Sequence, residues 1–382
     1  MGMDSQTLAF VAGESSGDLL AAHVLQALHA RAPDMRLAGI GGTHMQHAGF
    51  DAWWQSERLA VNGYADVLAR LPELLLMRRK LRQRLMAQPP AVFVGVDAPD
   101  FNLQLERRLR QVGIPVVHMV SPSIWAWRRE RIDLIRQAVD HMLCIFPFEP
   151  AIYADTGVKA TYIGHPLAEV IPLDPDRGAA RRALGLPAEA QILAVLPGSR
   201  RAEVRHLIAP FLGAAVLLVQ RGLASSVVVP IAHPGLKPMV LQAAKAYPGL
   251  PLVLIDGQSH VAMAACNLAI VASGTATLEC ALFKRPMVIG YRMSALSWRM
   301  MSGRGYLPDV GLPNILAGTR LVPELLQHDC TPEALAHAAS SLLDDAAQQR
   351  QLLDRFTEMH LSLRRDTAAL ASRAILDMAA AP

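Results

Sequence analysis

The sequence predicts an α/β protein with two domains, each built on a parallel sheet with helices on both faces. Short β-branched runs alternate with longer helical patterns, which is the rhythm of βαβ units. The strand runs are almost continuously apolar, as in strands that are buried on both faces. A proline-rich stretch at residues 164–177, GHPLAEVIPLDPDR, interrupts this rhythm once and indicates a linker between two similar halves.

The expected elements follow that alternation along the chain. The first half has strand patterns at residues 7–12, 36–40, 91–96, 115–120 and 141–145. Helical patterns lie between them at residues 18–30, 64–86, 101–111 and 128–139. The second half has strand patterns at residues 191–196, 226–231, 252–255, 268–271 and 286–289. We expect an N-terminal Rossmann-like domain at 1–165, a second one at 174–319, and C-terminal helices at 320–382 that pack back across the domains.

Composition limits the class of protein. Hydrophobic residues make up 52% of the 382 residues and charged residues 18%, which excludes a disordered chain. The net charge of +4 does not by itself indicate nucleic acid, because that footprint requires clustered positive charge. The four cysteines form no CxxC pair, so neither a zinc site nor a disulfide framework is expected. Scattered thiols of this kind fit a protein of the reducing cytoplasm. His44 and His47 have no third ligand nearby, and no metal or cofactor is expected.

No targeting or membrane-spanning segment is expected. The first residues, MGMDSQTLAFVAG, carry neither a secretion signal nor a myristoylation pattern. The longest apolar stretch, residues 208–219, contains Pro210 and is shorter than the roughly 20 residues that a span needs. The protein is therefore expected to be soluble or peripheral to a membrane.

The first strand pattern ends in GESSGD at residues 13–18. The glycines permit a tight turn, and the following helix would present free backbone N–H groups. Glu14, Ser15 and Ser16 are therefore candidates for contact with a sugar or an anion. An ordinary strand-to-helix turn with a capping residue such as Asp18 explains the same pattern equally well.

Two carboxylates follow the third strand pattern, in GVDAPDFN at residues 95–102. Asp97 and Asp100 stand where a strand ends and a helix begins, which is where α/β enzymes place catalytic groups. Either residue would also serve as a simple helix cap.

The next such loop, SPSIWAWR, contains two tryptophans. Trp125 and Trp127 would stack on a ligand, lie at an interface, or anchor the loop in the core.

Two loops of the second half have the composition of phosphate sites. In LPGSRRAEV, Gly198 and Ser199 leave room for a close approach, and Arg200 offers a planar fork suited to phosphate. In SGTATLE, small residues open a helix and would let a diphosphate reach its N-terminus. The residues concerned are Ser273, Gly274 and Thr275, with Glu279 placed to bind ribose hydroxyls. Two routine helix caps are the alternative. No GxGxxG or P-loop sequence occurs, which disfavours NAD and ATP.

The helix expected at residues 64–86 has an unusual surface. Pro72 is expected to begin its second part, with Leu74, Met77, Leu81 and Leu85 on one buried face. Other apolar residues lie among many cations, a mixture that suits an anionic lipid surface or an amphipathic ligand. A helix buried on two sides is the alternative. The candidates for a membrane-facing patch are Val67, Leu68, Leu71, Leu75 and Leu76.

Taken together, these motifs resemble the lipid-A-disaccharide synthase family. The matching stretches run from residue 13 to residue 318 in the family's order: GESSGD, GVDAPDFN, SPSIWAWR, GHP, LPGSRRAEV, SGTATLE, GYRM and LPNILAG. The resemblance implies a GT-B architecture, with two Rossmann-like domains facing each other across a cleft. It also implies an inverting transfer from UDP-2,3-diacylglucosamine to the 6-hydroxyl of 2,3-diacylglucosamine 1-phosphate, giving a β-1,6-linked disaccharide phosphate and UDP.

The resemblance also assigns roles. It implies that Asp97 is the base, that the two phosphate-type loops and Glu279 hold UDP, and that Asn314 orients a substrate. Asp100, one helical turn on, is the runner-up for the base and is otherwise expected to be a cap or support. Acylated substrates imply peripheral work at the cytoplasmic face of the inner membrane, on an anionic surface, without nucleic acid. A homodimer is left open. The alternatives are another UDP-sugar enzyme of this architecture, such as a cell-wall precursor transferase or an epimerase, or a non-catalytic nucleotide-binding protein at the membrane.

Overall fold

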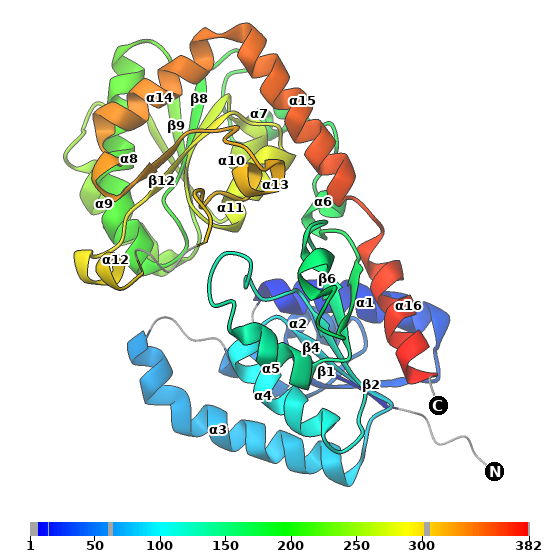
Figure 1. Ribbon diagram of the computed structural model, residues 1–382. Helices are drawn as coiled ribbons and strands as arrows, with labels where there is room; N and C mark the ends of the chain where they lie inside the picture. Colours follow the sequence, from blue (N-terminus) through cyan, green and yellow to red (C-terminus); the bar gives the residue numbers. More distant parts are fainter. Residues whose placement is uncertain (1–6, 14, 60–63, 302–305, 381–382) are drawn as a thin grey trace. The chain divides into compact units, whose positions relative to one another are not determined.

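The computed structural model describes residues 7–13, 15–59, 64–301 and 306–380 (Figure 1). Contacts divide the chain into two compact units. The first, which we call the N-unit, comprises Met1–Glu169 together with Leu363–Pro382. The second, the C-unit, is Val170–Ser362. The residues from 320 onward are thus shared between the two units.

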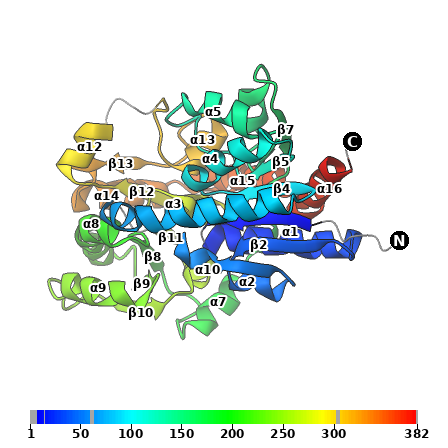
Figure 2. The same ribbon diagram turned by 90° about the horizontal axis from the view of Figure 1, so that it is seen from below.

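The N-unit is a seven-stranded parallel sheet with the order β3-β2-β1-β4-β5-β6-β7. The strands are β1 (Thr7–Ala12), β2 (Arg36–Gly41), β3 (Asp51–Gln55), β4 (Val92–Val96), β5 (Val116–Met119), β6 (His141–Cys144) and β7 (Lys159–Tyr162). The helices are α1 (Ser15–Arg31), α2 (Thr43–His47), α3 (Tyr64–Ala87), α4 (Pro99–Arg110), α5 (Arg131–Ala138), α6 (Leu167–Val170), α16 (Thr367–Ala379) and the 3-10 turns Ser56–Arg58 and Glu149–Tyr153. Helices α1 and α16 pack together on one face of the sheet, and α3, α4 and α5 cover the other (Figures 1 and 2).

The C-unit is a six-stranded parallel sheet with the order β10-β9-β8-β11-β12-β13. The strands are β8 (Ile192–Leu196), β9 (Ser226–Ile231), β10 (Leu252–Asp256), β11 (Leu268–Ala272), β12 (Met287–Tyr291) and β13 (Glu324–Leu326). The helices are α7 (Arg177–Ala183), α8 (Arg201–Gln220), α9 (Lys237–Ala244), α10 (Ser259–Ala265), α11 (Thr275–Leu282), α12 (Ala295–Met301), α13 (Leu312–Ala317), α14 (Pro332–Asp344), α15 (Ala346–Leu363) and the 3-10 turns Pro234–Leu236 and Gln327–Asp329. Helices α8, α9 and α14 lie on one face, and α7, α10, α11 and α13 on the other (Figure 1).

The central strands explain why both sheets form. Strands β4, β8 and β11 are buried at every position, as their continuous apolar sequences predict. On one face of the N-unit sheet, Met77, Leu81 and Leu85 of α3 join an apolar cluster with strand residues such as Phe93. Their i, i+4 spacing places them on one side of the helix, so the buried face of α3 is confirmed.

Three strands were not expected from the sequence, namely β3, β7 and β13. Each lies at or next to an edge of its sheet, and each is only partly buried. Their sequences, DAWWQ, KATY and ELL, mix polar and apolar residues because one side of an edge strand meets solvent. The continuous apolar pattern that identified the central strands is therefore absent from them.

Two expectations about helices require correction. Pro72 does not begin a second part of α3, because the helix runs unbroken from Tyr64 to Ala87 with Pro72 inside it. A proline removes only one backbone bond, and the packing of the next three turns on the sheet keeps the helix continuous. The apolar stretch at 208–219 belongs to the longer α8, which by length and hydropathy alone passes the test for a membrane span. The apolar segment of α8 is 56% buried, and the helix contacts α14 and the sheet, as the core helix of a globular domain does.

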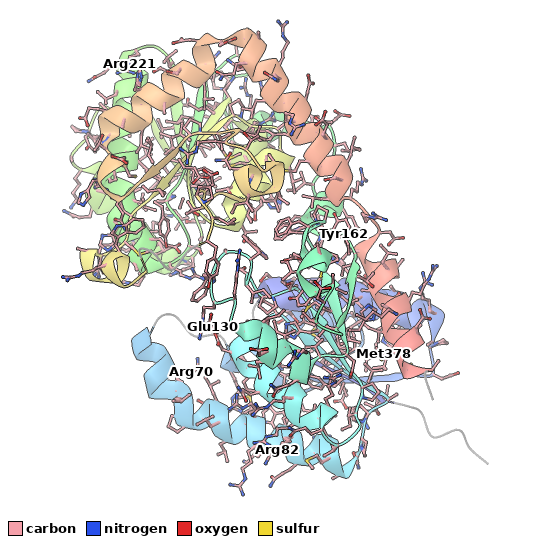
Figure 3. All side chains as sticks on the ribbon, viewed as in Figure 1. Arg70, Arg82, Glu130, Tyr162, Arg221 and Met378 are labelled. Carbon is pink, nitrogen blue, oxygen red and sulfur yellow. The ribbon has the colours of Figure 1, made fainter. Side chains whose placement is uncertain are left out.

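The end of the chain returns to the N-unit. The His165 N–H donates to the Leu363 carbonyl at 2.8 Å, and the Glu169 carboxylate accepts a bond from Thr367 N at 2.6 Å. The Arg365 guanidinium lies 5.4 Å from the ring centroid of Tyr162, which Figure 3 labels. These contacts dock α16 beside α1, whereas α14 is held to α8 in the C-unit by Arg221, which donates to Ser340 Oγ at 2.9 Å (Figure 3).

Candidate active site

Both sheets reverse their strand order once, and each reversal creates a crevice at the carboxyl ends of two strands. In the N-unit the crevice lies between β1 and β4, and in the C-unit between β8 and β11. Ligands of open α/β sheets bind at such switch points. The loops that begin at Gly13, Asp97, Gly198 and Ser273 flank these crevices, so the structure places four of the five predicted strand-end loops at switch points; the fifth, SPSIWAWR, follows β5.

Asp97 occupies a strained turn at the N-unit crevice. Asp97 and Ala98 both have positive φ angles, 52° and 46°. The backbone is held there by bonds from Asp97 N to the Met119 carbonyl at 2.9 Å and from Asn102 Nδ2 to the Asp97 carbonyl at 2.9 Å. A Cβ atom on Gly13 would lie 2.5 Å from the Ala98 Cβ, so the two loops approach each other as only glycine allows. Strain of this kind concentrates at functional sites.

The two carboxylates of this loop have different surroundings. Among the described residues, none donates a hydrogen bond or an ion pair to the Asp97 carboxylate, which is partly exposed. The Asp100 carboxylate instead forms ion pairs with Arg131 and, at 3.9 Å, with Arg128. The Asp97 carboxylate is thus open to a ligand, whereas the Asp100 carboxylate is held by two guanidinium groups.

The turn after β1 is only partly described. Glu14 and the side chain of Ser15 lie outside the described residues, and Ser16 is exposed in the first turn of α1. Asp18 does not cap its own helix. Its buried carboxylate accepts bonds from Gly42 N at 2.6 Å and His44 N at 2.9 Å, and so caps the short helix α2. Asp18 therefore fixes one loop against another.

A buried ion pair lies beneath the Asp97 loop. Glu106 Oε1 is 2.7 Å from His118 Nδ1, and both side chains are fully buried. Gly95 is required beside them, because a Cβ there would lie 1.9 Å from Glu106 Oε1. Burial lowers the pKa of His118, but Glu106, with a smaller contribution from Asp97, outweighs it and leaves that pKa above 6.5. The remaining atoms Glu106 Oε2 and His118 Nε2 have no hydrogen-bond partner within the described structure.

The loop with two tryptophans is anchored through one of them. The Trp125 indole donates to Glu149 Oε1 at 3.1 Å and packs edge-on against Phe148, with 5.4 Å between the ring centroids. Burial raises the pKa of Glu149 to about 7, although bonds from Phe146 N, Trp125 and Ile145 N oppose this change. Trp127 is exposed, so its indole, unlike that of Trp125, is available to a ligand or surface.

The C-unit crevice holds a cavity of about 490 Å³. It brings together all of the residues predicted to bind UDP except Asn314: Gly198, Ser199, Arg200, Ser273, Gly274, Thr275 and Glu279. The volume lies in the range of small-ligand and cofactor sites. The β10–α10 turn, with Gly257, Gln258 and Ser259, completes the wall.

Arg200 is held at the mouth of the cavity by Glu203. The Glu203 carboxylate accepts bonds from Ser199 N and Arg200 N, both at 3.2 Å, and from Arg200 Nη1 at 3.1 Å. Gly198 has a φ of 104°, and a Cβ there would lie 2.4 Å from Glu203 Oε2. The side chain of Arg200 is 71% exposed, so it can leave Glu203 for an incoming anion.

The opposite wall is the N-terminus of α11. Gly274 precedes this helix with a φ of 148°. No side chain of the described residues caps the helix, and among those residues none fills the space beside the Gly274 Cα. The first N–H groups of the helix are therefore free to meet an anion. Glu279, one turn further on, lies 3.5 Å from His260 Nε2 and is largely buried.

Asn314 lies away from that cavity, at the base of a loop. Its side chain is buried and uses all of its bonding capacity on the protein, with Leu321 N, Val322 N, the Val322 carbonyl and Glu324 as partners. Glu324 also accepts bonds from the N–H groups of residues 310 and 311, and the carbonyl of residue 310 accepts the Ser273 hydroxyl at 2.9 Å. Asn314 thus braces the loop that supports Ser273.

Sequence reasoning missed several residues of this cavity. Glu203 was overlooked although it stands three residues after Arg200, which is the spacing of a capping box. Gln258 of this cavity, and His260 beside Glu279, are not predicted because the turn after β10 has no distinctive composition. The only signal was DGQS directly after an apolar strand, at the edge where the other loops meet.

On α3, the structure exposes part of the predicted apolar patch. Leu71, Leu75 and Leu76 are 41%, 46% and 52% exposed, so these three are not buried between two layers of the chain. The side chains of Val67 and Leu68 lie outside the described part of the structure.

Within the described ranges, no group of three or more His, Cys, Asp or Glu residues has the geometry to hold a metal ion.

Solved structures share this fold at low sequence identity. A UDP-GlcNAc 2-epimerase from Neisseria meningitidis bound to UDP-GlcNAc has a TM-score of 0.64, 11% identity and coverage of 97% of this chain and 98% of its own. The calicheamicin glycosyltransferase CalG4 gives 0.60, 15% and complete coverage of both chains. Anabaena HepE, in complex with UDP and glucose, has a TM-score of 0.59 and 13% identity, with coverage of 98% of this chain and 99% of its own. The fold and its switch-point sites define the GT-B class of two-domain α/β proteins.

Comparison of sequences gives the family within that class. The Lipid-A-disaccharide synthetase family model matches residues 8–376. Proteins named lipid-A-disaccharide synthase from Burkholderia vietnamiensis and Cupriavidus pinatubonensis are 52% identical over 370 and 373 residues. Each alignment covers 97% of this chain, and 95% and 93% of the relative. The chain belongs to the lipid-A-disaccharide synthase family, and it is a hexosyltransferase that uses a UDP-sugar and a lipid acceptor. The resemblance in the motifs is confirmed.

Proposed function

We propose that the C-unit cavity binds the UDP part of UDP-2,3-diacylglucosamine, and that Asp97 activates the acceptor, 2,3-diacylglucosamine 1-phosphate. The observation that carries this proposal is the gathering of Arg200, the Ser273–Thr275 turn and Glu279 in one cavity at a topological switch point. A guanidinium and a free helix N-terminus are the groups that bind a diphosphate, and a carboxylate suits ribose hydroxyls.

In the proposed reaction, the Asp97 carboxylate accepts the proton of the acceptor's 6-hydroxyl while that oxygen attacks the anomeric carbon of the donor. The bond from that carbon to the UDP oxygen breaks on the opposite face, so the configuration inverts. Negative charge then grows on UDP, where Arg200 and the N–H groups at the start of α11 stabilise it. Asp97 and not Asp100 has this role, because the Asp100 carboxylate is already paired with Arg131.

Asn314 acts indirectly in this proposal. It was expected to orient a substrate, but its amide group is fully used within the C-unit. Its contribution is to brace the loop that supports Ser273, and through Ser273 the phosphate-binding turn. It is therefore a positioning residue.

The protein works at the cytoplasmic face of the inner membrane, associated peripherally through α3. Both proposed substrates carry acyl chains and so reside in a bilayer. Leu71, Leu75 and Leu76 are exposed on a helix that also carries Arg79, Lys80 and Arg84. Apolar burial and attraction to anionic lipid act together on such a surface.

One assay tests the proposed reaction. The enzyme is incubated with UDP-2,3-diacylglucosamine, with and without 2,3-diacylglucosamine 1-phosphate, and released UDP is measured. UDP release that depends on the acceptor is the expected result. Equal release from plain UDP-N-acetylglucosamine, or release that does not need the acceptor, would contradict the proposed substrates.

A further inference from the structure

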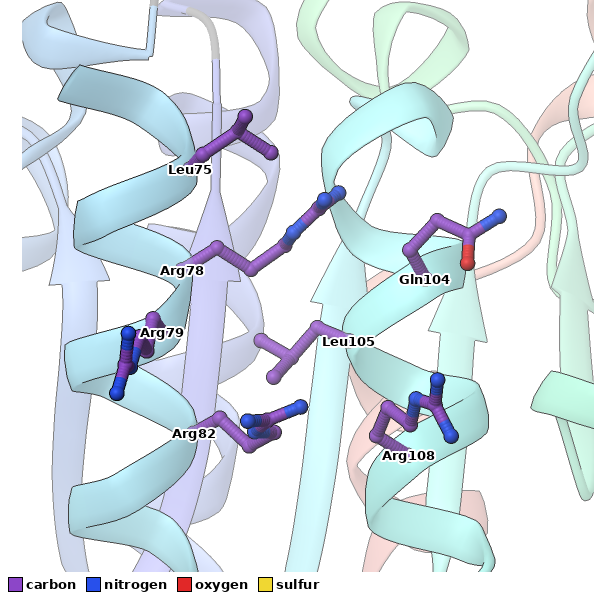
Figure 4. Close-up of a pocket in the computed structure, with 7 residues that line it drawn as sticks. All are labelled: Leu75, Arg78, Arg79, Arg82, Gln104, Leu105 and Arg108. Atoms are coloured by element: carbon purple, nitrogen blue, oxygen red, sulfur yellow. The ribbon is translucent and has the colours of Figure 1, made fainter. Parts of the chain in front are cut away.

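A second cavity, of about 260 Å³, lies between α3 and α4 in the N-unit. Four arginines line it, with one amide and two leucines: Arg78, Arg79, Arg82, Arg108, Gln104, Leu75 and Leu105. Figure 4 shows Arg78 and Arg82 extending from α3 toward α4, with Leu105 between them. Leu105 is buried and forms the floor, whereas Leu75 is exposed at one end. The cavity belongs to neither switch-point site.

The positive charge of this pocket is not balanced by the protein. Among the described residues, no carboxylate lies within ion-pair distance of any of the four guanidinium groups. The partners that two of them contact are neutral: Arg78 lies over the Phe101 ring at 6.0 Å, and Arg108 donates to Gln111 at 3.3 Å. Other arginines of the same two helices do find carboxylates, as Arg110 does with Asp140 at 2.6 Å.

The unbalanced charge of the pocket affects Arg78. Burial lowers the pKa of its guanidinium, and the neighbouring charge of Arg82 lowers it further. An anion placed between the two side chains would remove that repulsion and accept bonds from both planar forks. The two non-bridging oxygens of a phosphate can each accept a bidentate contact from a guanidinium fork, which a halide cannot do.

We infer that the pocket between α3 and α4 binds the phosphate group of an anionic phospholipid headgroup. This inference rests on the proposal that α3 meets a membrane. The pocket is smaller than the usual range for nucleotide-sized ligands, which begins at roughly 300 Å³, but suffices for a glycerophosphate group. Leu75 at its edge, with Leu71 and Leu76 nearby on α3, provides an apolar surface for the acyl chains of the same molecule.

A reacting acceptor is not the ligand that this geometry favours. Gln104 and Arg108 lie five and nine residues beyond Pro99, the first residue of α4. At about 1.5 Å per residue, the pocket is roughly 8–14 Å along the helix from the Asp97 loop. That separation is larger than the width of one sugar ring, and the acceptor's phosphate is therefore a separate outcome of the test below.

The test compares two double variants of the full-length protein that each remove two positive charges from α3. The pocket variant is Arg78→Gln/Arg82→Gln, and the matched control is Lys80→Gln/Arg84→Gln, because neither Lys80 nor Arg84 lines the pocket. Binding is measured by co-sedimentation with vesicles of phosphatidylglycerol and phosphatidylcholine, and of phosphatidylcholine alone. Thermal melting confirms that both variants are folded.

We expect the pocket variant to lose at least roughly tenfold more affinity for the anionic vesicles than the control does, because only it loses a bidentate phosphate contact. Equal loss in the two variants would mean diffuse attraction and would overturn the pocket, while leaving membrane association by α3 intact. No vesicle binding by the wild type would contradict both proposals. If the pocket variant unfolds, Arg108→Gln replaces it, with Arg107→Gln as its control.

Two further arms distinguish the source of the phosphate. Inorganic phosphate at millimolar concentration is expected to leave vesicle binding almost unchanged at constant ionic strength; full competition would identify a site for free phosphate instead. The KM for the acceptor is also measured in phospholipid-free detergent. A rise in that KM in the pocket variant alone would assign the pocket to the acceptor and overturn the phospholipid.

Discussion

The two switch-point crevices of this molecule have the same topology, but the carboxylate proposed to act in the first lacks the partners that hold the carboxylates of the second. In the N-unit, Asp97 stands on a strained turn, and within the described structure its carboxylate has no hydrogen-bond partner. In the C-unit, Glu203, Glu279 and Glu324 are each bonded to a neighbour. The same fold thus presents a free acceptor of protons in one unit and a set of ordered donors in the other.

This difference follows from what each proposed role requires. A general base must keep its lone pairs available and its position fixed. The position is fixed by the bond from Asp97 N to the Met119 carbonyl and by the bond from the Asn102 side-chain amide to the Asp97 carbonyl. A site for a diphosphate must instead aim N–H groups at the ligand without reorganisation. The carboxylates of Glu203 and Glu324 contribute to that by holding the loops that carry those donors.

The largest effect is expected at Asp97. Asp97→Asn keeps the shape of the side chain but removes its basicity, so kcat should fall by at least ~10²-fold. Asp100→Asn is the matched control, because it removes an equal charge three residues away and should cost little turnover. Steady-state kinetics with both substrates measure this. A large loss in Asp100→Asn with little loss in Asp97→Asn would reverse the two assignments.

Arg200 should give the next largest effect, and in the other unit. Arg200→Ala removes a charge-assisted contact to the diphosphate, so kcat/KM for the donor should fall by roughly 10- to 100-fold. Arg205→Ala, which removes the same charge from a residue outside the cavity, should change it far less. If both substitutions have equal effects, Arg200 contributes only to the overall positive electrostatic potential around the site.

The proposed contact with lipid also belongs to the N-unit. Leu71→Ser/Leu76→Ser should weaken binding to anionic vesicles by about tenfold, because exposed leucines would be buried in the bilayer. The control is Leu241→Ser/Leu361→Ser, which changes two exposed leucines of the C-unit. Equal losses in the two variants, measured by co-sedimentation, would show that α3 has no special part in binding.

The stability of the N-unit should depend on pH through Glu149. Burial raises its pKa from 4.5 to about 7. Between these pH values the native protein retains a proton that the unfolded chain has released, so the free energy of unfolding should fall as the pH rises from about 5 to about 7. Glu149→Gln should remove about 1 kcal/mol or more of that dependence, measured by urea denaturation at several pH values. The same slope in variant and wild type would mean that other groups cause it.

The sequence allowed the central strands of both sheets to be predicted, but not the edge strands. Strands buried on both faces, such as β1 and β4, have apolar sequences that identify them, whereas the edge strands β3 and β13 do not. The four crevice loops could be predicted because glycines, prolines and N-cap residues mark the ends of strands. The bracing role of Asn314 could not, since it depends on Glu324 and on Ser273, which lie 10 and 41 residues away in the sequence.

The division of labour between the two units is tested most directly by measuring two quantities in the same two variants. The dissociation constant of UDP is measured by calorimetry and single-turnover transfer by rapid quench, in Asp97→Asn and Arg200→Ala. The account predicts that Asp97→Asn binds UDP like the wild type but transfers at least ~10²-fold more slowly, and that Arg200→Ala binds UDP more weakly. Weakened UDP binding in Asp97→Asn together with unchanged UDP binding in Arg200→Ala would contradict it.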